Sequence, residues 1–211
     1  RDNGLLTKGD LYEVGRADLV GKYIGWTAQI VKDKFKDAKG SVLFIDEAYS
    51  LIDDKNGLYG DEAINTIVQE MENNRENMIV IFAGYPDKME QFLNRNPGLR
   101  SRIAFHVPFH DYDTDELVAI ADLIACKSNL RFTKESYNKL FSVLDTARKT
   151  ADFGNGRYVR NLIEQARMEQ ANRIVQMDYE NVTETALQTL TAEDIPMHAP
   201  PHNAKNYKIG F

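Results

Sequence analysis

The sequence has a single cysteine, Cys126, among its 211 residues. One thiol cannot close a disulfide within the chain, so a disulfide-stabilised secreted fold is excluded. Cys126 falls in an apolar helical pattern, which predicts a small buried side chain; a reactive thiol is the alternative.

Long hydrophobic runs and an excess of positive charge are also missing. No segment approaches the roughly 18 apolar residues of a membrane span, and no signal peptide is evident. The formal net charge of −6 argues against a non-specific nucleic-acid binder. We therefore expect a soluble, cytoplasmic protein with no membrane partner and no nucleic-acid partner. The chain starts at Arg1 rather than Met, which suggests a truncation.

The first half of the chain alternates strand-like and helical patterns. Strands are predicted near residues 10–14, 42–45, 78–83 and 103–109, and Thr27 is predicted to cap the helix between the first two. The runs at 42–45 and 78–83 are apolar on both faces, which is typical of a covered parallel sheet. The alternation predicts an α/β fold with a parallel sheet.

From Thr114 onward the pattern is helical only. Helices are predicted at 114–128, 133–148 and 157–177, with Thr114 and Thr133 near their starts as capping residues. We therefore predict an α/β domain at residues 1–112, a small all-helical domain at 113–195 and a poorly ordered tail at 196–211.

Two adjacent carboxylates, Asp46 and Glu47, directly follow the buried strand at 42–45. Ligands of parallel sheets bind where the strands end, so these acids are expected at a binding edge. One carboxylate there can hold Mg²⁺ and the next can polarise a water at a nucleotide phosphate. The loop that would cradle the phosphates, Gly-x-x-x-x-Gly-Lys-Ser/Thr, is absent from the sequence.

Arginines and a glycine-flanked loop complete the candidate site. Arg100 and Arg102 precede the last predicted strand, where an arginine can reach a neighbouring subunit's γ-phosphate; a surface salt bridge is the alternative for each. Arg157 follows Gly154-Asn155-Gly156 at a helix start, where a guanidinium can fold over a nucleotide or simply be solvated. The loop Gly21-Lys22-Tyr23-Ile24-Gly25 presents an aromatic residue that either grips a ligand or packs on the sheet.

This combination, in this order, resembles the AAA+ ATPases. More narrowly, it is similar to the family of the red-type Rubisco activase and stage V sporulation protein K. The resemblance covers about residues 10 to 195. It is carried by Asp18–Ala28, Val42–Tyr49, Ala83–Tyr85, Asn96–Ile103 and Gly154–Arg157.

The resemblance implies a role for each matching residue. Asp46 would help to hold Mg²⁺ bound to ATP, and Glu47 would activate the attacking water. Arg102, with Arg100 behind it, would be the arginine finger, and Arg157, then Arg160, the sensor of the helical lid. Lys22, Tyr23, Ile24 and Gly25 would form the pore loop that contacts the substrate, and residues 50–60 would form a second pore-facing segment. Many relatives carry a polar sensor residue after the strand that corresponds to 78–83, and Tyr85 would be its substitute here.

The missing phosphate loop is the main departure from the family pattern. In such a fold the strand before that loop lies between the strands at 78–83 and 103–109, so its loss would leave both without a neighbour. We expect a C-terminal fragment that lacks this loop, does not bind ATP and closes the gap by rearrangement or with another copy.

The leading interpretation is a fragment of an ATPase that remodels or threads a client protein in a ring, usually a hexamer, using ATP and Mg²⁺. The alternative is a non-hydrolysing assembly or interaction module on the same scaffold. A nucleic-acid helicase would need the absent loop, a basic groove and a second sheet domain, none of which the sequence shows.

Overall fold

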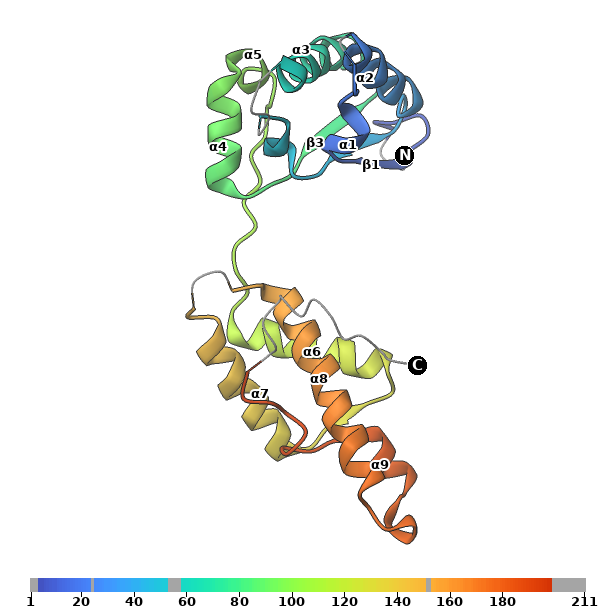
Figure 1. Cartoon of the computed structure of the whole chain (residues 1–211), viewed down its shortest axis with the longest axis vertical. Helices are drawn as coiled ribbons and strands as arrows, with labels where there is room; N and C mark the ends of the chain where they lie inside the picture. Colours follow the sequence, from blue (N-terminus) through green and yellow to red (C-terminus); the bar gives the residue numbers. More distant parts are fainter. Residues whose placement is uncertain (1–3, 24, 53–57, 151–152, 199–211) are drawn as a thin grey trace. The chain divides into compact units, whose positions relative to one another are not determined.

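The computed structural model describes residues 4–23, 25–52, 58–150 and 153–198. They belong to two compact units, Arg1–Pro108 and Phe109–Phe211 (Figure 1). Each unit has its own hydrophobic core. The first, the sheet unit, carries a parallel sheet, and the second, the helical unit, is mainly α-helical. The predicted fold class is therefore confirmed.

The sheet of the first unit has three parallel strands in the order β1 (Leu11–Val14), β2 (Val42–Ile45) and β3 (Ile79–Phe82). Val14 pairs with Ile45, and Ile45 pairs with Phe82, so the strands end level with one another. Their carboxyl ends therefore form a single rim.

Helices lie between these strands and after the last of them. They are α1 (Arg16–Leu19), α2 (Trp26–Asp37), the 3-10 helix η1 (Ala48–Ile52), α3 (Leu58–Asn73), α4 (Pro86–Arg95) and α5 (Pro97–Arg100). Thr27 does not cap α2, because the helix begins one residue earlier with Gly25 as its N-cap. The Thr27 hydroxyl instead accepts a hydrogen bond from the Gly21 N–H at 3.1 Å.

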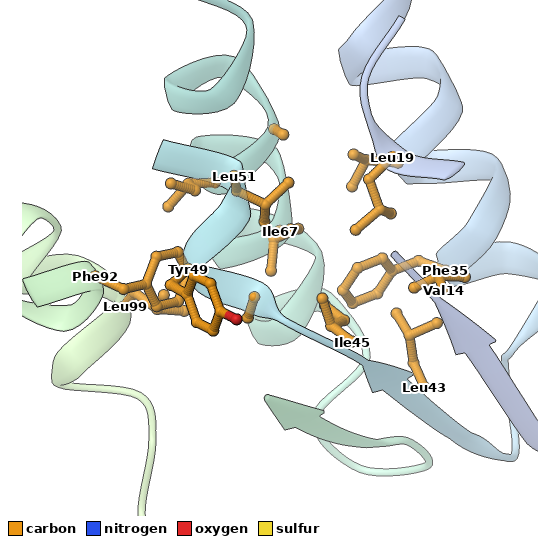
Figure 2. Close-up of a cluster of buried hydrophobic side chains, with 14 of the residues drawn as sticks. Val14, Leu19, Phe35, Leu43, Ile45, Tyr49, Leu51, Ile67, Phe92 and Leu99 are labelled. Carbon is orange, nitrogen blue, oxygen red and sulfur yellow. The ribbon is translucent and has the colours of Figure 1, made fainter. Parts of the chain in front are cut away.

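The core of this unit lies between one face of the sheet and its helices. Phe35 of α2 and Ile67 of α3 pack with Leu43 and Ile45 of β2, and all four are at most 1% exposed (Figure 2). The expectation of a sheet covered on both faces is only half met. Ile79 and Ile81, which point to the opposite face, remain 39% and 42% exposed.

The fourth predicted strand does not form. Residues 103–109 have no regular secondary structure, and no backbone hydrogen bond joins them to β3 in the part of the chain that the structure describes. Ile103 still packs against the core, but Phe105 and Phe109 are 85% and 94% exposed. An apolar alternation alone cannot make a strand, because the backbone groups of a strand need a neighbour.

The helical unit is built from three long helices, α6 (Thr114–Lys127), α7 (Lys134–Ala147) and α8 (Asn155–Val175). Their core contains Leu117, Leu140, Leu144, Leu162 and Ile163, all fully buried. The cap of α6 is Asp113 rather than Thr114, since the Asp113 carboxylate accepts the Glu116 N–H at 2.8 Å. Thr133 caps α7 as predicted, accepting the Ser136 N–H at 3.1 Å.

Two sequence-based expectations for this unit are wrong. It is not purely helical: β4 (Arg131–Phe132) and β5 (Thr189–Leu190) form a short parallel pair, alongside η2 (Tyr179–Asn181) and α9 (Glu184–Gln188). Cys126 is exposed, because α6 turns its neighbour Ala125 inward instead. Among the described residues, no helix combines the length and apolarity needed to cross a bilayer.

Candidate functional site

The two acids lie where β2 reaches the carboxyl rim. The Asp46 N–H donates to the Val14 carbonyl at 3.0 Å, which extends the pairing of β1 and β2 by one residue. On the other side, the Ala83 N–H donates to the Ile45 carbonyl at 2.9 Å. Both acid residues are exposed. The sheet therefore fixes the backbone beneath them while their carboxylates face solvent.

A sharp turn follows the strand and sets the directions of the two acids. Glu47 has a φ of 46°, in the left-handed region that a residue with a side chain seldom adopts. The Glu47 N–H donates to Asp46 Oδ1 at 2.9 Å, and the Glu47 carbonyl accepts the Ser50 N–H at 2.7 Å. Such strain is typical of functional turns. Here it lets the chain pass from β2 straight into η1.

Tyr49, to which the sequence interpretation gave no role, holds the Glu47 side chain. Its hydroxyl donates to Glu47 Oε1 at 3.1 Å, and the residue is only 5% exposed. Burial, then the hydrogen bond to Glu47 and the nearby negative charge, raise the pKa of Tyr49 above its ordinary value. The Lys88 ammonium lies 4.6 Å from the centre of the ring. A tyrosine two residues after an acid pair is the only sequence signal for this contact.

The end of β3 is shaped to receive that ring. A Cβ atom on Gly84 would lie 2.7 Å from Tyr49 Cδ1 and 2.8 Å from Met89 Sδ. Any residue with a side chain at position 84, including a polar residue in the sensor role, would displace the Tyr49 ring. Tyr85, the predicted substitute sensor, is the N-cap of α4, is 62% exposed and has its ring centre 6.3 Å from that of Tyr49.

The two candidate finger arginines lie at the end of α5 and just beyond it, each in an ion pair. Arg102 Nε is 3.5 Å from Glu72 Oε2, and Arg102 Nη1 donates to the Gly98 carbonyl at 3.0 Å. Arg100 pairs with Glu90. Their side chains remain 37% and 45% exposed, so the pairs are of the weak surface kind.

The predicted pore loop is exposed where the structure describes it. Lys22 and Gly25 are exposed, and Tyr23 is 60% exposed with its ring edge against Trp26 at 4.9 Å between centres. Ile24 lies outside the described residues, as do residues 53–57 of the second predicted pore segment.

Arg157 and Arg160 lie in the first turns of α8 in the helical unit, and both are exposed. The start of α8 is fixed by Asn155, whose φ is 46°. Asn155 Nδ2 donates to Asp111 Oδ1 at 2.6 Å, and Asn155 Oδ1 accepts the Tyr112 N–H at 3.1 Å. The asparagine thus ties the beginning of α8 to the segment that leads into α6.

The acid pair fits a magnesium ion that is held mainly by a nucleotide. Magnesium usually takes one or two protein carboxylates and completes its shell with phosphate oxygens and water. Among the described residues, no group of three or more His, Cys, Asp or Glu side chains could hold a metal by itself. Asp46 uses Oδ1 for the Glu47 N–H, and its carboxylate has a second oxygen that could serve as a ligand.

Comparisons with known proteins agree with this geometry. Residues 6–109 match the family of ATPases associated with various cellular activities (AAA), and residues 113–205 match the AAA lid domain. The chain is 47% identical over 193 residues to a CfxQ homolog of Pyropia yezoensis and 44% identical to a chloroplastic ribulose bisphosphate carboxylase/oxygenase activase of Cyanidioschyzon merolae. Each match covers 91% of this chain, but only 64% and 66% of the relative.

The fold is shared with distant solved structures. The FIGL-1 AAA domain superposes with a TM-score of 0.61 at 17% identity, over 86% of this chain and 58% of that one. Strong sequence identity over most of the chain and the match of both units to AAA domains lead to one conclusion. The chain belongs to the AAA family of ATPases.

Proposed function

We propose that this chain supplies the magnesium-binding and water-activating acids, the arginine finger and the lid of an ATPase that remodels a client protein. The observation that carries the proposal is the exposed pair Asp46 and Glu47 at the carboxyl rim of a parallel sheet in an AAA-family chain. In this role Asp46 binds Mg²⁺ together with ATP, and Glu47 orients and deprotonates the attacking water.

The arginines act on the phosphates from two directions in this proposal. Arg102, supported by Arg100, reaches the γ-phosphate bound by a neighbouring subunit. To do so, it gives up its weak ion pair with Glu72 and binds the phosphate instead. Arg157, with Arg160 one turn on, contacts the nucleotide of its own subunit from the lid, and Tyr85 borders the site at the end of β3. Subunits must then be arranged in a ring, with six as the expected number.

The exposed ring of Tyr23 carries the motion to the client. Flanked by Lys22 and Gly25, it is the residue on this loop best suited to grip a polypeptide. The name of the Cyanidioschyzon merolae relative makes ribulose bisphosphate carboxylase/oxygenase one candidate client. A client of a sporulation protein K-like ATPase is the other. The location that we propose for this chain is the cytoplasm.

The printed sequence contains no phosphate-binding loop, so we expect this chain by itself not to bind ATP. Titration calorimetry with Mg·ATP tests this. The expected result is no measurable heat of binding at micromolar ATP. Micromolar affinity would show that other residues replace the loop.

A chimera tests the catalytic assignment. The residues of the Cyanidioschyzon merolae activase that precede its AAA domain are joined ahead of Leu6, where the AAA family match of this chain begins. We expect the chimera to hydrolyse ATP, and Glu47→Gln to lower kcat by about a hundredfold or more while nucleotide binding persists. Glu76→Gln, an exposed acid just before β3, is the matched control and should leave kcat unchanged. Equal loss in both variants would contradict the role of Glu47.

The second candidate is a non-hydrolysing interaction module, favoured by the same absence of a phosphate loop from the printed sequence. It predicts that the chimera with Glu47→Gln behaves like the unmodified chimera in every assay. A hydrolysis rate that depends on Glu47 excludes it.

A further inference from the structure

One side chain joins the first turn of α8 to the segment that leads into α6. Asn155 Nδ2 donates to Asp111 Oδ1 at 2.6 Å, and Asn155 Oδ1 accepts the Tyr112 N–H at 3.1 Å. The bond to Asp111 goes to a carboxylate, which makes it stronger than a hydrogen bond between neutral groups. Because the two partners are consecutive residues, the amide fixes the direction of the segment as well as its position.

The backbone of Asn155 has an uncommon conformation. Its φ of 46° lies in the left-handed region, which asparagine enters more readily than most residues with a side chain. Strain of this kind persists only where the surroundings enforce it, and it is concentrated at functional positions. Glycine would relieve the strain but could make neither contact, whereas asparagine tolerates the conformation and makes both.

The two elements that Asn155 connects are each held firmly by other contacts. On the side of α8, the rings of Phe153 and Tyr158 lie 5.2 Å apart between centres, and both pack against the core of the helical unit. On the other side, Asp113 and Glu116 exchange hydrogen bonds of 2.8 and 2.9 Å that cap α6. The Asn155 amide therefore joins two parts that already have fixed structures.

The joined parts include a residue of the proposed site. Arg157 comes two residues after Asn155 in the first turn of α8, and the segment of Asp111 and Tyr112 follows shortly after Pro108, where the sheet unit ends. The direction of a helix start sets where its side chains can reach, and small errors in such placement are costly to catalysis.

We propose that Asn155 is a positioning residue, which locks the first turn of α8 to residues 111–112 and so sets the direction in which Arg157 reaches the nucleotide. The inference rests on the proposed function and deepens it. Asn155 acts through Arg157 and is assigned no contact with the nucleotide. Through the same two hydrogen bonds, a change in position at Arg157 is passed to the segment that follows the sheet unit in the chain.

Amide hydrogen exchange of the full chain tests the link without nucleotide. Asn155→Gly removes both contacts and keeps the left-handed backbone, so the Tyr112 amide should exchange about tenfold faster or more. Asn129→Gly is the matched control, because Asn129 has a φ of 56° just beyond the opposite end of α6. It should leave the Tyr112 amide unchanged. An unchanged Tyr112 amide in Asn155→Gly, or equal acceleration in both variants, would overturn the proposal.

ATP hydrolysis by the chimera with the activase residues tests the effect on Arg157. Asn155→Gly should lower kcat/KM about tenfold, but about twofold or less when Arg157→Ala is already present, because no guanidinium is then left to position. A merely structural role would lower kcat/KM by the same factor in both backgrounds, and that result would overturn the proposal.

A reversal of the pair provides the rescue. Asn155→Asp places a second carboxylate against Asp111 and should lower kcat/KM of the chimera by about tenfold. Addition of Asp111→Asn restores one donor and one acceptor with their places exchanged, so kcat/KM should return to within about twofold of the unmodified chimera. Absence of rescue would contradict a role of these hydrogen bonds.

The same assays separate this inference from the proposed function. An inactive unmodified chimera, or one whose kcat/KM is unchanged by Arg157→Ala, would overturn both together. A chimera that loses activity with Arg157→Ala but keeps it with Asn155→Gly would overturn the positioning role of Asn155 alone.

Discussion

The two units of this chain differ in how they satisfy their backbone. In the helical unit, hydrogen bonds close within each helix and the helix ends are capped by nearby side chains such as Asp113 and Thr133. In the sheet unit, the strand β3 depends on neighbours from elsewhere in the sequence, and among the described residues it pairs with β2 on one side. A helix is completed locally, whereas a sheet is completed only by another strand.

Side chains complete the helical unit where its backbone is irregular. The Gln170 amide donates to the carbonyls of Leu187 and Thr189 at 3.0 and 2.9 Å, and so holds the segment around α9 against α8. Arg173 makes two hydrogen bonds to Asp194, which is 1% exposed, at 2.8 and 2.9 Å. The ends of this unit are thus fixed by buried polar contacts.

The largest expected effect is the loss of that buried ion pair. Asp194→Asn leaves the Arg173 guanidinium without its charge partner and should cost about 3 kcal/mol of unfolding free energy. Urea unfolding followed by circular dichroism measures this. Lys149→Ala, which removes an exposed pair with Asp145 in the same unit, should change little. A loss no larger than that of the control would mean that the contact is not what completes the helical unit.

The same pair makes the helical unit sensitive to acid. Burial would raise the pKa of Asp194, but hydrogen bonds from Arg173 and Thr191 outweigh it and lower the pKa below its ordinary value. Because its pKa is lower in the folded state, the Asp194 carboxylate stabilises the fold at pH values above its ordinary pKa. This stabilisation is lost as the pH falls through the folded-state pKa of Asp194. Urea unfolding at decreasing pH should show this loss in the unmodified chain, and Asp194→Asn should flatten it. Identical pH profiles would contradict the assignment.

In the sheet unit, Gly84→Ala should cost about 1–3 kcal/mol, because its Cβ would collide with the Tyr49 ring. Displacement of the ring from its buried position should also let the pKa of Tyr49 fall toward its ordinary value, which carbon-13 NMR of labelled tyrosine measures. Gly156→Ala is the control: Gly156 lies in α8 with nothing within 4 Å of the added Cβ. A stable variant with an unchanged Tyr49 pKa would show that the ring does not need this glycine.

The smallest effect is expected from Tyr49→Phe, which removes one hydroxyl and keeps the ring. Stability should drop only slightly, because Glu47 can turn to solvent. In the chimera with the activase residues, kcat should fall more than KM rises, since the hydroxyl positions Glu47 without touching substrate. Tyr49→His, which offers a different hydrogen-bond donor, is the comparison, and a kcat as low as that of Tyr49→Phe would show that the tyrosine hydroxyl itself is needed. A normal kcat in Tyr49→Phe would contradict this assignment.

Much of the architecture could be predicted because it follows from local patterns. The apolar runs at 42–45 and 78–83 became β2 and β3 within a residue, and Thr133 capped α7 as its position before an apolar helical pattern indicated. The acids after β2 were expected at the carboxyl rim, and the pairing of Val14 and Ile45 places their backbone there.

Errors arose where the outcome depended on residues far away in the sequence. Ile103–Val107 has the alternation of a strand but forms none, because alternation does not provide a neighbouring backbone. Cys126 lies in an apolar helical pattern but faces solvent, since the packing of α6 against α7 and α8 decided which stripe is buried. β4 and β5 join residues more than fifty positions apart, too short and too distant for any local signal.

By itself, the sequence determined the alternation of strands and helices, the helical second half and the acids that close β2. These depend on side-chain periodicity and backbone preferences within a few residues. Only the tertiary structure decided that Tyr49 binds Glu47, that Gly84 makes room for it and that, among the described residues, the segment at 103–109 forms no strand beside β3. Those three facts depend on which distant segments approach one another, and packing sets that choice for the chain as a whole.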